Sequence, residues 1–155
     1  MSGKVKVLIK KLHASAQVPT AATSGSGACD LSATSTKMTD EYVEYGTGLA
    51  IAIPTDYVGL VFPRSSVSNK GWALANGVGV IDSDYRGEIK LRFYDVSSQS
   101  QDLPYVEGDR IGQLLLVPRV DVQYVDADSL PDTERGAGGF GSTDAPRKTP
   151  PGSRL

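Results

Sequence analysis

Residues 42–63 read YVEYGTGLAIAIPTDYVGLVFP, and this stretch decides the fold class. Val, Ile, Leu and Tyr dominate it, while Gly and Pro interrupt it too often for a helix. Runs of β-branched and aromatic residues between turn residues are typical of strands. We therefore expect strands at Tyr42 to Ile53 and Tyr57 to Pro63.

The same pattern continues in both directions along the chain. No window of about a dozen residues keeps a helical spacing of apolar positions without an intervening Gly or Pro, so only one short turn of helix is expected, after Ser66. Many short strands usually close on themselves to protect their edges, which predicts an all-β fold, a distorted jelly roll or a closed β-barrel. The further strands that we expect are Val5 to Leu12, Glu88 to Val96, Arg110 to Val117 and Asp121 to Val125.

Composition limits the class of protein. A length of 155 residues fits a single domain. The formal net charge of −2 argues against direct nucleic-acid binding through an overall positive field, so any phosphate binding must be local. Cys29 is the single cysteine and cannot form an intramolecular disulfide, which favours a reduced, intracellular compartment. No apolar run approaches the ~18 residues of a membrane span, so we expect a soluble protein without membrane contact.

The segment 77–87, GVGVIDSDYRG, carries the strongest local signal. An apolar strand ends in Asp82 and Asp84 and then turns into another strand, which predicts a β-hairpin. Aspartate is a common turn residue, so a solvated turn is one interpretation. The other is catalytic, because Asp82 directly follows Val80 and Ile81, and a partly desolvated carboxylate there can act as a base toward water.

A second signal lies at the end of the predicted strand Tyr57 to Pro63. Arg64 offers planar donors to a phosphate group, and the two serines that follow add hydroxyl donors. The structural alternative is that Arg64 makes an ion pair and Ser66 caps a helical turn. We also hypothesise that Asp109, next to Arg110, forms an ion pair that holds Arg64 in place.

The third signal is the Gly-rich stretch 135–144, RGAGGFGSTD. Glycines let the main chain approach an anion closely, and an aromatic ring such as Phe140 can stack on a base. It is not a Walker-type loop, because no Lys precedes the Ser and Thr. A mobile lid over a nucleotide and a flexible tail are both compatible with this composition.

Taken in chain order, five segments resemble the signature motifs of the homotrimeric dUTP pyrophosphatase (dUTPase) family. They are Gly27 to Ala33, Pro63 to Ser66, Asn76 to Glu88, Gly108 to Leu114 and Arg135 to Thr143. The resemblance implies a dUTPase-like β-clip subunit in a homotrimer whose active sites are shared between subunits.

The resemblance also implies an organisation of the chain. Residues 1–134 would form the β domain, residues 135–144 a flexible C-terminal arm that closes over the active site, and residues 145–155 a disordered tail.

The activity implied by the resemblance is hydrolysis of dUTP to dUMP and pyrophosphate. This reaction limits uracil incorporation into DNA and supplies dUMP for thymidylate synthesis. Asp82 would activate the water that attacks the α-phosphorus in line. The implied cofactor is Mg²⁺, held mainly by the substrate phosphates and linked to Asp30 through water.

The resemblance assigns substrate contacts residue by residue. Tyr85 would pack against the deoxyribose, and Asn76 together with nearby main-chain groups would read uracil. Arg135 and Phe140 would reach the site from a different subunit. The substrate-binding residues implied are Arg64, Ser65, Ser66, Asn76, Gly79, Val80, Ile81, Tyr85, Lys90, Gln113, Arg135, Phe140, Gly141 and Ser142.

Two other functions stay open at this point. The dCTP deaminases share the implied fold, but they use a glutamate to activate water at the base and lack the Gly-Phe-Gly-Ser-Thr arm. A regulatory binding module is the non-enzymatic alternative, with residues 145–155 as its contact.

Overall fold

The computed structural model describes residues 4–97 and 104–140. Gly141, Ser142 and the predicted tail 145–155 lie outside the described residues. Within the described ranges the chain forms ten strands and one short 3₁₀ helix. They are β1 (Leu8–Lys11), β2 (Cys29–Ser32), β3 (Ser35–Met38), β4 (Val43–Gly46), β5 (Leu49–Ala52), β6 (Tyr57–Pro63), η1 (Ser65–Lys70), β7 (Trp72–Leu74), β8 (Gly79–Ile81), β9 (Lys90–Asp95) and β10 (Arg110–Pro118).

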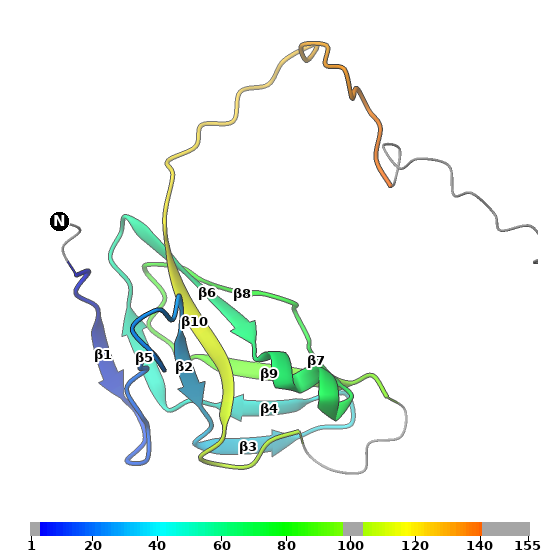
Figure 1. The fold of residues 1–155 in the computed structure, drawn as a ribbon. Coiled ribbons are helices and arrows are strands. Elements are labelled where there is room, and N and C mark those ends of the chain that lie inside the picture. The colour runs from blue at the N-terminus through cyan, green and yellow to red at the C-terminus, as the bar shows by residue number, and fades with distance from the viewer. Residues whose placement is uncertain (1–3, 98–103, 141–155) are drawn as a thin grey trace, which may run out of the picture. The chain divides into compact units, whose positions relative to one another are not determined.

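The strands form three antiparallel sheets, ordered β1-β5, β2-β10-β6-β8 and β3-β4-β9-β7. In Figure 1, β2, β6 and β10 run steeply through the view while β3, β4 and β9 lie across it. The all-β class is confirmed. The closed β-barrel that we also expected is not formed, because among the described strands each four-stranded sheet ends in two edge strands that pair with another strand on one side only.

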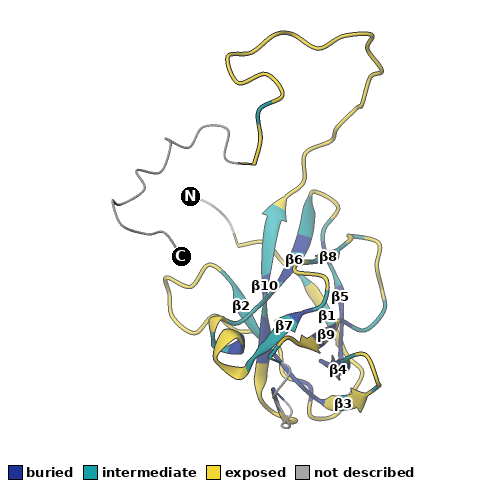
Figure 2. Ribbon diagram, turned by 90° about the vertical axis from the view of Figure 1, so that its right-hand side faces the viewer, coloured by how far each residue is buried: buried dark blue, intermediate teal, exposed yellow. Residues whose placement is uncertain are grey.

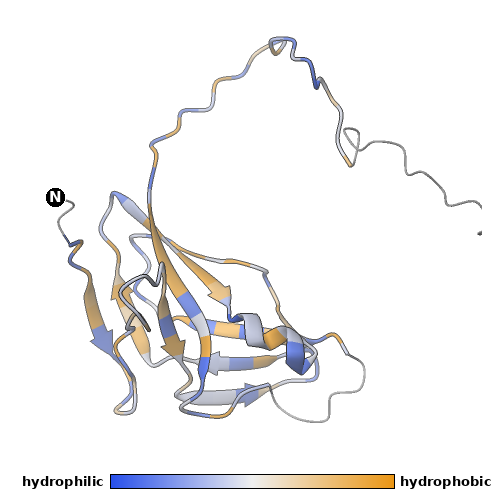
Figure 3. Ribbon diagram, in the orientation of Figure 1, coloured by the Kyte–Doolittle hydropathy of each residue, from blue (hydrophilic) through white to orange (hydrophobic). Residues whose placement is uncertain are grey.

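The core lies between the two four-stranded sheets. Tyr45 on β4 and Phe93 on β9 are fully buried, and both rings make edge or tilted contacts with Tyr105, with centroid distances of 5.5–5.9 Å. The hydroxyl of Tyr45 donates a 2.8 Å hydrogen bond to the carbonyl oxygen of Tyr105. Figure 2 shows the buried inner segments and Figure 3 the apolar strands that supply them. Apolar alternation along β4 and β9 thus produces a packed core.

Several predicted strands match the structure closely. Tyr57 to Pro63 is β6 without change, and Arg110 to Val117 is β10 with one added residue. The predicted strand Tyr42 to Ile53 is two strands, because Gly48 has a φ of +64° that turns the chain between β4 and β5. Strands β2, β3 and β7 were not predicted, because they are too short to show a clear apolar period in the sequence.

The predicted hairpin at residues 77–87 is wrong. Strand β8 pairs with β6, whereas β9 pairs with β4 and β7, so the segment crosses from one four-stranded sheet to the other. Local turn signals identify a reversal but not the partner of each strand, which long-range pairing decides.

The predicted strand at Asp121 to Val125 is also wrong for the described chain. These residues have no strand partner, and the side chains of Val122, Tyr124 and Val125 are exposed. The chain divides at this point into two compact units, Met1–Asp121 and Val122–Leu155. The boundary predicted at residue 134 stays a prediction.

In the part of the chain that the structure describes, no helix has the length and apolar character needed to cross a membrane.

Candidate active site

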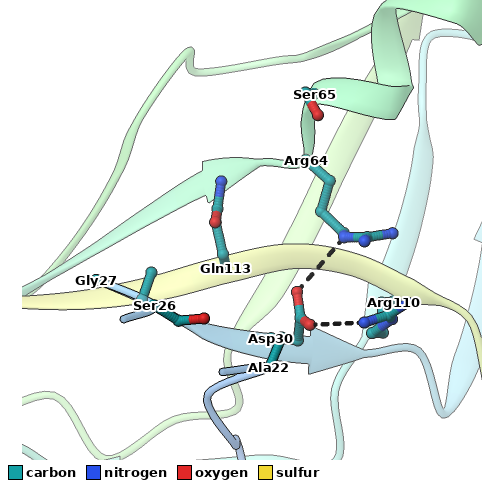
Figure 4. A pocket seen from close by; sticks show the side chains of 9 residues that line it. Ala22, Ser26, Gly27, Asp30, Arg64, Ser65, Arg110 and Gln113 are labelled. Atoms are coloured by element: carbon teal, nitrogen blue, oxygen red, sulfur yellow. Dashed lines mark hydrogen bonds and ion pairs between the residues drawn. The ribbon is translucent and has the colours of Figure 1, made fainter. Parts of the chain in front are cut away.

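A polar pocket of about 290 Å³ opens beside β2, β10 and the end of β6 (Figure 4). It brings together four residues that the sequence analysis assigned to phosphate or metal binding, namely Asp30, Arg64, Ser65 and Gln113. Its full lining is Ala22, Ser26, Gly27, Ala28, Asp30, Arg64, Ser65, Arg110 and Gln113.

Strand register explains why these side chains meet. On β10, Gln113 lies opposite Asp30 of β2 on one side and Phe62 of β6 on the other. Arg64 follows the last residue of β6 and immediately precedes η1. Gln113 Nε2 donates a 3.2 Å hydrogen bond to the carbonyl oxygen of Pro63, which ties β10 to the start of the Arg64 segment.

Asp30 lies between two arginines. Its Oδ1 is 3.4 Å from Nε of Arg64, and its Oδ2 is 3.1 Å from Nη1 of Arg110. The hypothesis that Asp109 pairs with Arg64 is wrong, because the ion-pair partner of Arg64 is Asp30, while Asp109 accepts a hydrogen bond from the main-chain nitrogen of Val106. Arg110 was expected to have only a structural role, but it lies in the fourth motif and lines the pocket.

The pocket is suited to an anion. Each guanidinium group has five N–H donors, and the contacts with Asp30 use only a part of them. With the Ser65 hydroxyl and the Gln113 amide, these donors can bind the oxygens of a phosphate chain.

The pocket also fits a magnesium ion bound mainly by substrate. Among the described residues, no group of three or more His, Cys, Asp or Glu side chains could hold a metal ion. Asp30 is the one carboxylate that lines the pocket. Mg²⁺ usually keeps several waters and takes one or two carboxylates plus phosphates, so this donor set fits it.

The residues predicted to bind the base and sugar form a second group around β8. Asn76 and Val80 are exposed, and Gly79 and Ile81 are half-buried. Since β8 pairs only with β6 among the described strands, its outer edge has main-chain groups available to a ligand.

The loop after β8 carries Asp82 and Tyr85. The Tyr85 hydroxyl donates a 3.0 Å hydrogen bond to the carbonyl oxygen of Glu88, and its ring lies so close to Gly87 that a Cβ there would overlap it. Asp82 is exposed, so a single chain does not desolvate its carboxylate as the sequence analysis expected.

The two groups lie apart within one chain. Pairing of Ile81 with Gly59 places Asp82 toward the start of β6, whereas Arg64 follows its end. At ~3.3 Å per residue, the five steps from Gly59 to Arg64 span about 17 Å. Asp82 and Arg64 of the same chain therefore do not share one site.

Lys90 lies in a separate ionic cluster. Its Nζ is 3.1 Å from Glu44 Oε1 and 3.8 Å from Glu88 Oε2, and Arg92 Nε is 2.7 Å from Glu44 Oε2. Burial by itself would raise the pKa of Glu44, but hydrogen bonds from Arg92 and Lys90 hold that pKa below its usual value. The same contact raises the pKa of Lys90. The Lys90 side chain is thus engaged in ion pairs, so it is not available for the predicted base contact, which a main-chain group would make.

Glu44→Gln should reduce stability at neutral pH but not in acid. A carboxylate whose folded pKa is depressed stabilises the fold above its unfolded pKa, here 4.5, and loses that contribution as pH falls through the folded pKa. The free energy of unfolding, measured by urea titration between pH 7 and pH ~3, should show a wild-type advantage that shrinks below pH 4.5. A difference that is independent of pH would contradict this assignment.

Arg135 and Phe140 belong to the second unit. Arg135 Nε donates a 2.9 Å hydrogen bond to the carbonyl oxygen of Gly138, within a local turn. Phe140 is fully exposed and has a φ of +49°. Gly141 and Ser142, predicted to act with them, lie outside the described residues.

Comparison with known proteins bears on the identity of this site. The dUTPase family model matches residues 14–144. A deoxyuridine 5'-triphosphate nucleotidohydrolase of Desulfitobacterium hafniense is 44% identical over 148 residues, covering 90% of this chain and 95% of the relative. One from Nocardia farcinica is 38% identical and covers 99% of this chain and 94% of the relative.

Solved structures agree in fold. A mutant of the Staphylococcus bacteriophage 80alpha dUTPase with dUpNHpp has a TM-score of 0.77 at 23% identity, covering 90% of this chain and 99% of that chain. A mutant dUTPase from phage phi11 of S. aureus, described with a structural Mg(II) ion, has a TM-score of 0.67 at 21% identity, covering 83% and 100%. The family match over residues 14–144 and the relative at 44% identity show that the chain belongs to the dUTPase family.

Proposed function

We propose that this chain is a dUTP diphosphatase that hydrolyses dUTP to dUMP and pyrophosphate. The observation that carries the proposal is the pocket in which Arg64, Ser65 and Gln113 surround Asp30, in a chain 44% identical to a deoxyuridine 5'-triphosphate nucleotidohydrolase. Such an activity would limit uracil incorporation into DNA and supply dUMP for thymidylate synthesis.

The active sites would be shared between copies in a homotrimer. The separation of Asp82 from Arg64 along β6 supports this arrangement, because a phosphate chain bound at Arg64 lies too far from the Asp82 of its own chain. A second copy that supplies the β8 group would complete the site.

In the proposed reaction, Asp82 accepts a proton from a water molecule that attacks the α-phosphorus in line. Pyrophosphate leaves from the opposite side, and no covalent intermediate forms. Arg64, Ser65 and Gln113 hold the phosphate oxygens and offset the growing negative charge. Asp30 and the substrate phosphates would hold Mg²⁺, which would supply positive charge beside the phosphates.

Selectivity would come from the group around β8. The edge strand offers main-chain donors and acceptors at Gly79, Val80 and Ile81, and Asn76 adds a side-chain amide; the main chain of Lys90 completes the uracil contacts. A site built from such groups rejects a mismatched base, because its polar groups would be left unpaired. The exposed ring of Tyr85 would pack against the deoxyribose and exclude a 2′-hydroxyl.

The C-terminal segment would close the site from a third copy. Arg135 would reach the γ-phosphate and Phe140 would cover uracil, with Gly141 and Ser142 as further substrate contacts. The exposure of Phe140 in a lone chain supports this role, since a large apolar ring gains from being covered.

The proposed function is tested by pyrophosphate release from dUTP, dTTP, dCTP and UTP in parallel, with Mg²⁺ and with a chelator. We expect fast, Mg²⁺-assisted release of pyrophosphate from dUTP. The rate of release from each of the other three nucleotides should be at least ~10²-fold lower, since each lacks a hydrogen-bonding or steric match to the proposed base and sugar site. Deamination of dCTP would instead support the related deaminase activity. Release from none of the four would leave only a binding role.

A further inference from the structure

A second polar cavity, of about 210 Å³, lies next to the active-site pocket. Its lining is Arg64, Ser66, Lys70, Tyr105, Asp109 and Arg110. Arg64 and Arg110 line both cavities, whereas Gln113 and Ser65 line only the first. At ~30 Å³ for each water, the second cavity has room for a phosphate group and some of its hydration.

Tyr105 supplies the main sign that this cavity has a ligand. The residue is 4% exposed, and among the described residues its hydroxyl makes no hydrogen bond of good geometry, although the Ser66 side chain lies near it. Burial raises the pKa of Tyr105, although the nearby Ser66 side chain and the Arg64 charge both lower it, so the hydroxyl keeps its proton at neutral pH and can donate. A buried donor without an acceptor destabilises a fold, which favours an acceptor that is supplied from outside the chain.

The cationic groups around the cavity keep free donors. Asp30 contacts one nitrogen of each arginine, Nε of Arg64 and Nη1 of Arg110, and Figure 4 shows both guanidinium groups on the side of Asp30 away from Gln113. Lys70 lines the cavity, and its Nζ lies 5.3 Å from the centroid of the Tyr105 ring. The three cations Arg64, Lys70 and Arg110 and the two carboxylates of Asp30 and Asp109 together carry a formal charge of +1.

We propose that this cavity is a second anion site, which binds a phosphate group from orthophosphate or pyrophosphate through Lys70, Tyr105, Ser66 and the free donors of Arg64 and Arg110. An anion bound there would draw on the same two guanidinium groups as the phosphates of a nucleotide in the first pocket. Product phosphates would therefore weaken nucleotide binding through Arg64 and Arg110.

Calorimetric titration of the full-length protein with orthophosphate and with pyrophosphate, in the absence of nucleotide, tests this proposal. Lys70→Gln should weaken the affinity at this site about tenfold, the usual effect of losing one charge-assisted hydrogen bond. Tyr105→Phe should weaken it as well while leaving the melting temperature equal or higher, because it removes an unpaired buried hydroxyl. If both variants lose affinity for orthophosphate and pyrophosphate alike, the site binds a single phosphate group. If they lose affinity for pyrophosphate alone, pyrophosphate is the ligand.

Two controls separate this site from its neighbour. Gln113→Ala changes the first pocket but not the second. Lys37→Gln removes an exposed lysine that lines neither cavity. Both variants should therefore leave the Lys70-dependent binding of the anions unchanged. Unchanged affinities for both anions in Lys70→Gln and Tyr105→Phe would overturn the proposal, and so would a lower melting temperature for Tyr105→Phe. None of these readouts involves turnover of dUTP, so the proposed catalytic function stands or falls separately.

Discussion

Asp82→Asn should lower kcat for dUTP hydrolysis by about 10²- to 10⁴-fold, the range expected for loss of a general base. Asparagine keeps the shape of the side chain but cannot accept the proton of the attacking water. Asp82 is exposed in the loop after β8, so the substitution leaves the packed core untouched. The measurement is pyrophosphate release at saturating dUTP, with circular dichroism and sedimentation to verify fold and assembly.

Asp84→Asn is the matched control for that experiment. Asp84 lies two residues further along the same loop and is also exposed, so the control has the same change of charge in nearly the same place. It should retain activity within a few-fold of wild type. Equal activity of the Asp82 and Asp84 variants would refute the proposed role of Asp82.

Mixing two inactive variants should restore activity if the site is shared between copies. Arg64→Ala damages the phosphate pocket, and Asp82→Asn damages the β8 loop. The strand register separates these two residues within one chain, so the proposed site takes them from different chains. In trimers assembled at random from equal amounts, about one quarter of the sites should combine an intact Arg64 with an intact Asp82. Co-refolding the two variants should thus recover up to about a quarter of wild-type turnover, from a starting level near zero.

A second mixture provides the control. Arg64→Ala and Gln113→Ala both damage the pocket between β6 and β10 of the same chain, so no combination of these two variants restores an intact pocket. That mixture should stay as inactive as its components. Failure of the first mixture to recover any activity, with trimers verified by sedimentation, would mean that the sites are not shared.

The local pattern of residues was sufficient for the class of fold and for several element bounds. Strands such as β6 and β10 have alternating or continuous apolar residues between turn residues. This pattern can be recognised from a few neighbouring positions in the sequence. Residue types suited to phosphate binding, such as Arg64 followed by two serines, can also be recognised from neighbouring positions. Short strands such as β2 and β7 have too few residues to show a period, so they were not predicted.

The tertiary structure decided how these pieces combine. Asp30 meets Arg64 and Arg110 because β2 and β6 flank β10, a pairing between segments more than 30 residues apart that no local signal encodes. The turn at residues 77–87 was visible in the sequence, but the separate partners of β8 and β9 were not. The sequence by itself therefore determined an all-β chain with phosphate-binding and acidic motifs, since these depend on composition and local spacing. Only long-range strand register decided that Asp82 lies at the opposite end of β6 from Arg64, because register is selected by the burial of whole strand faces rather than by neighbouring residues.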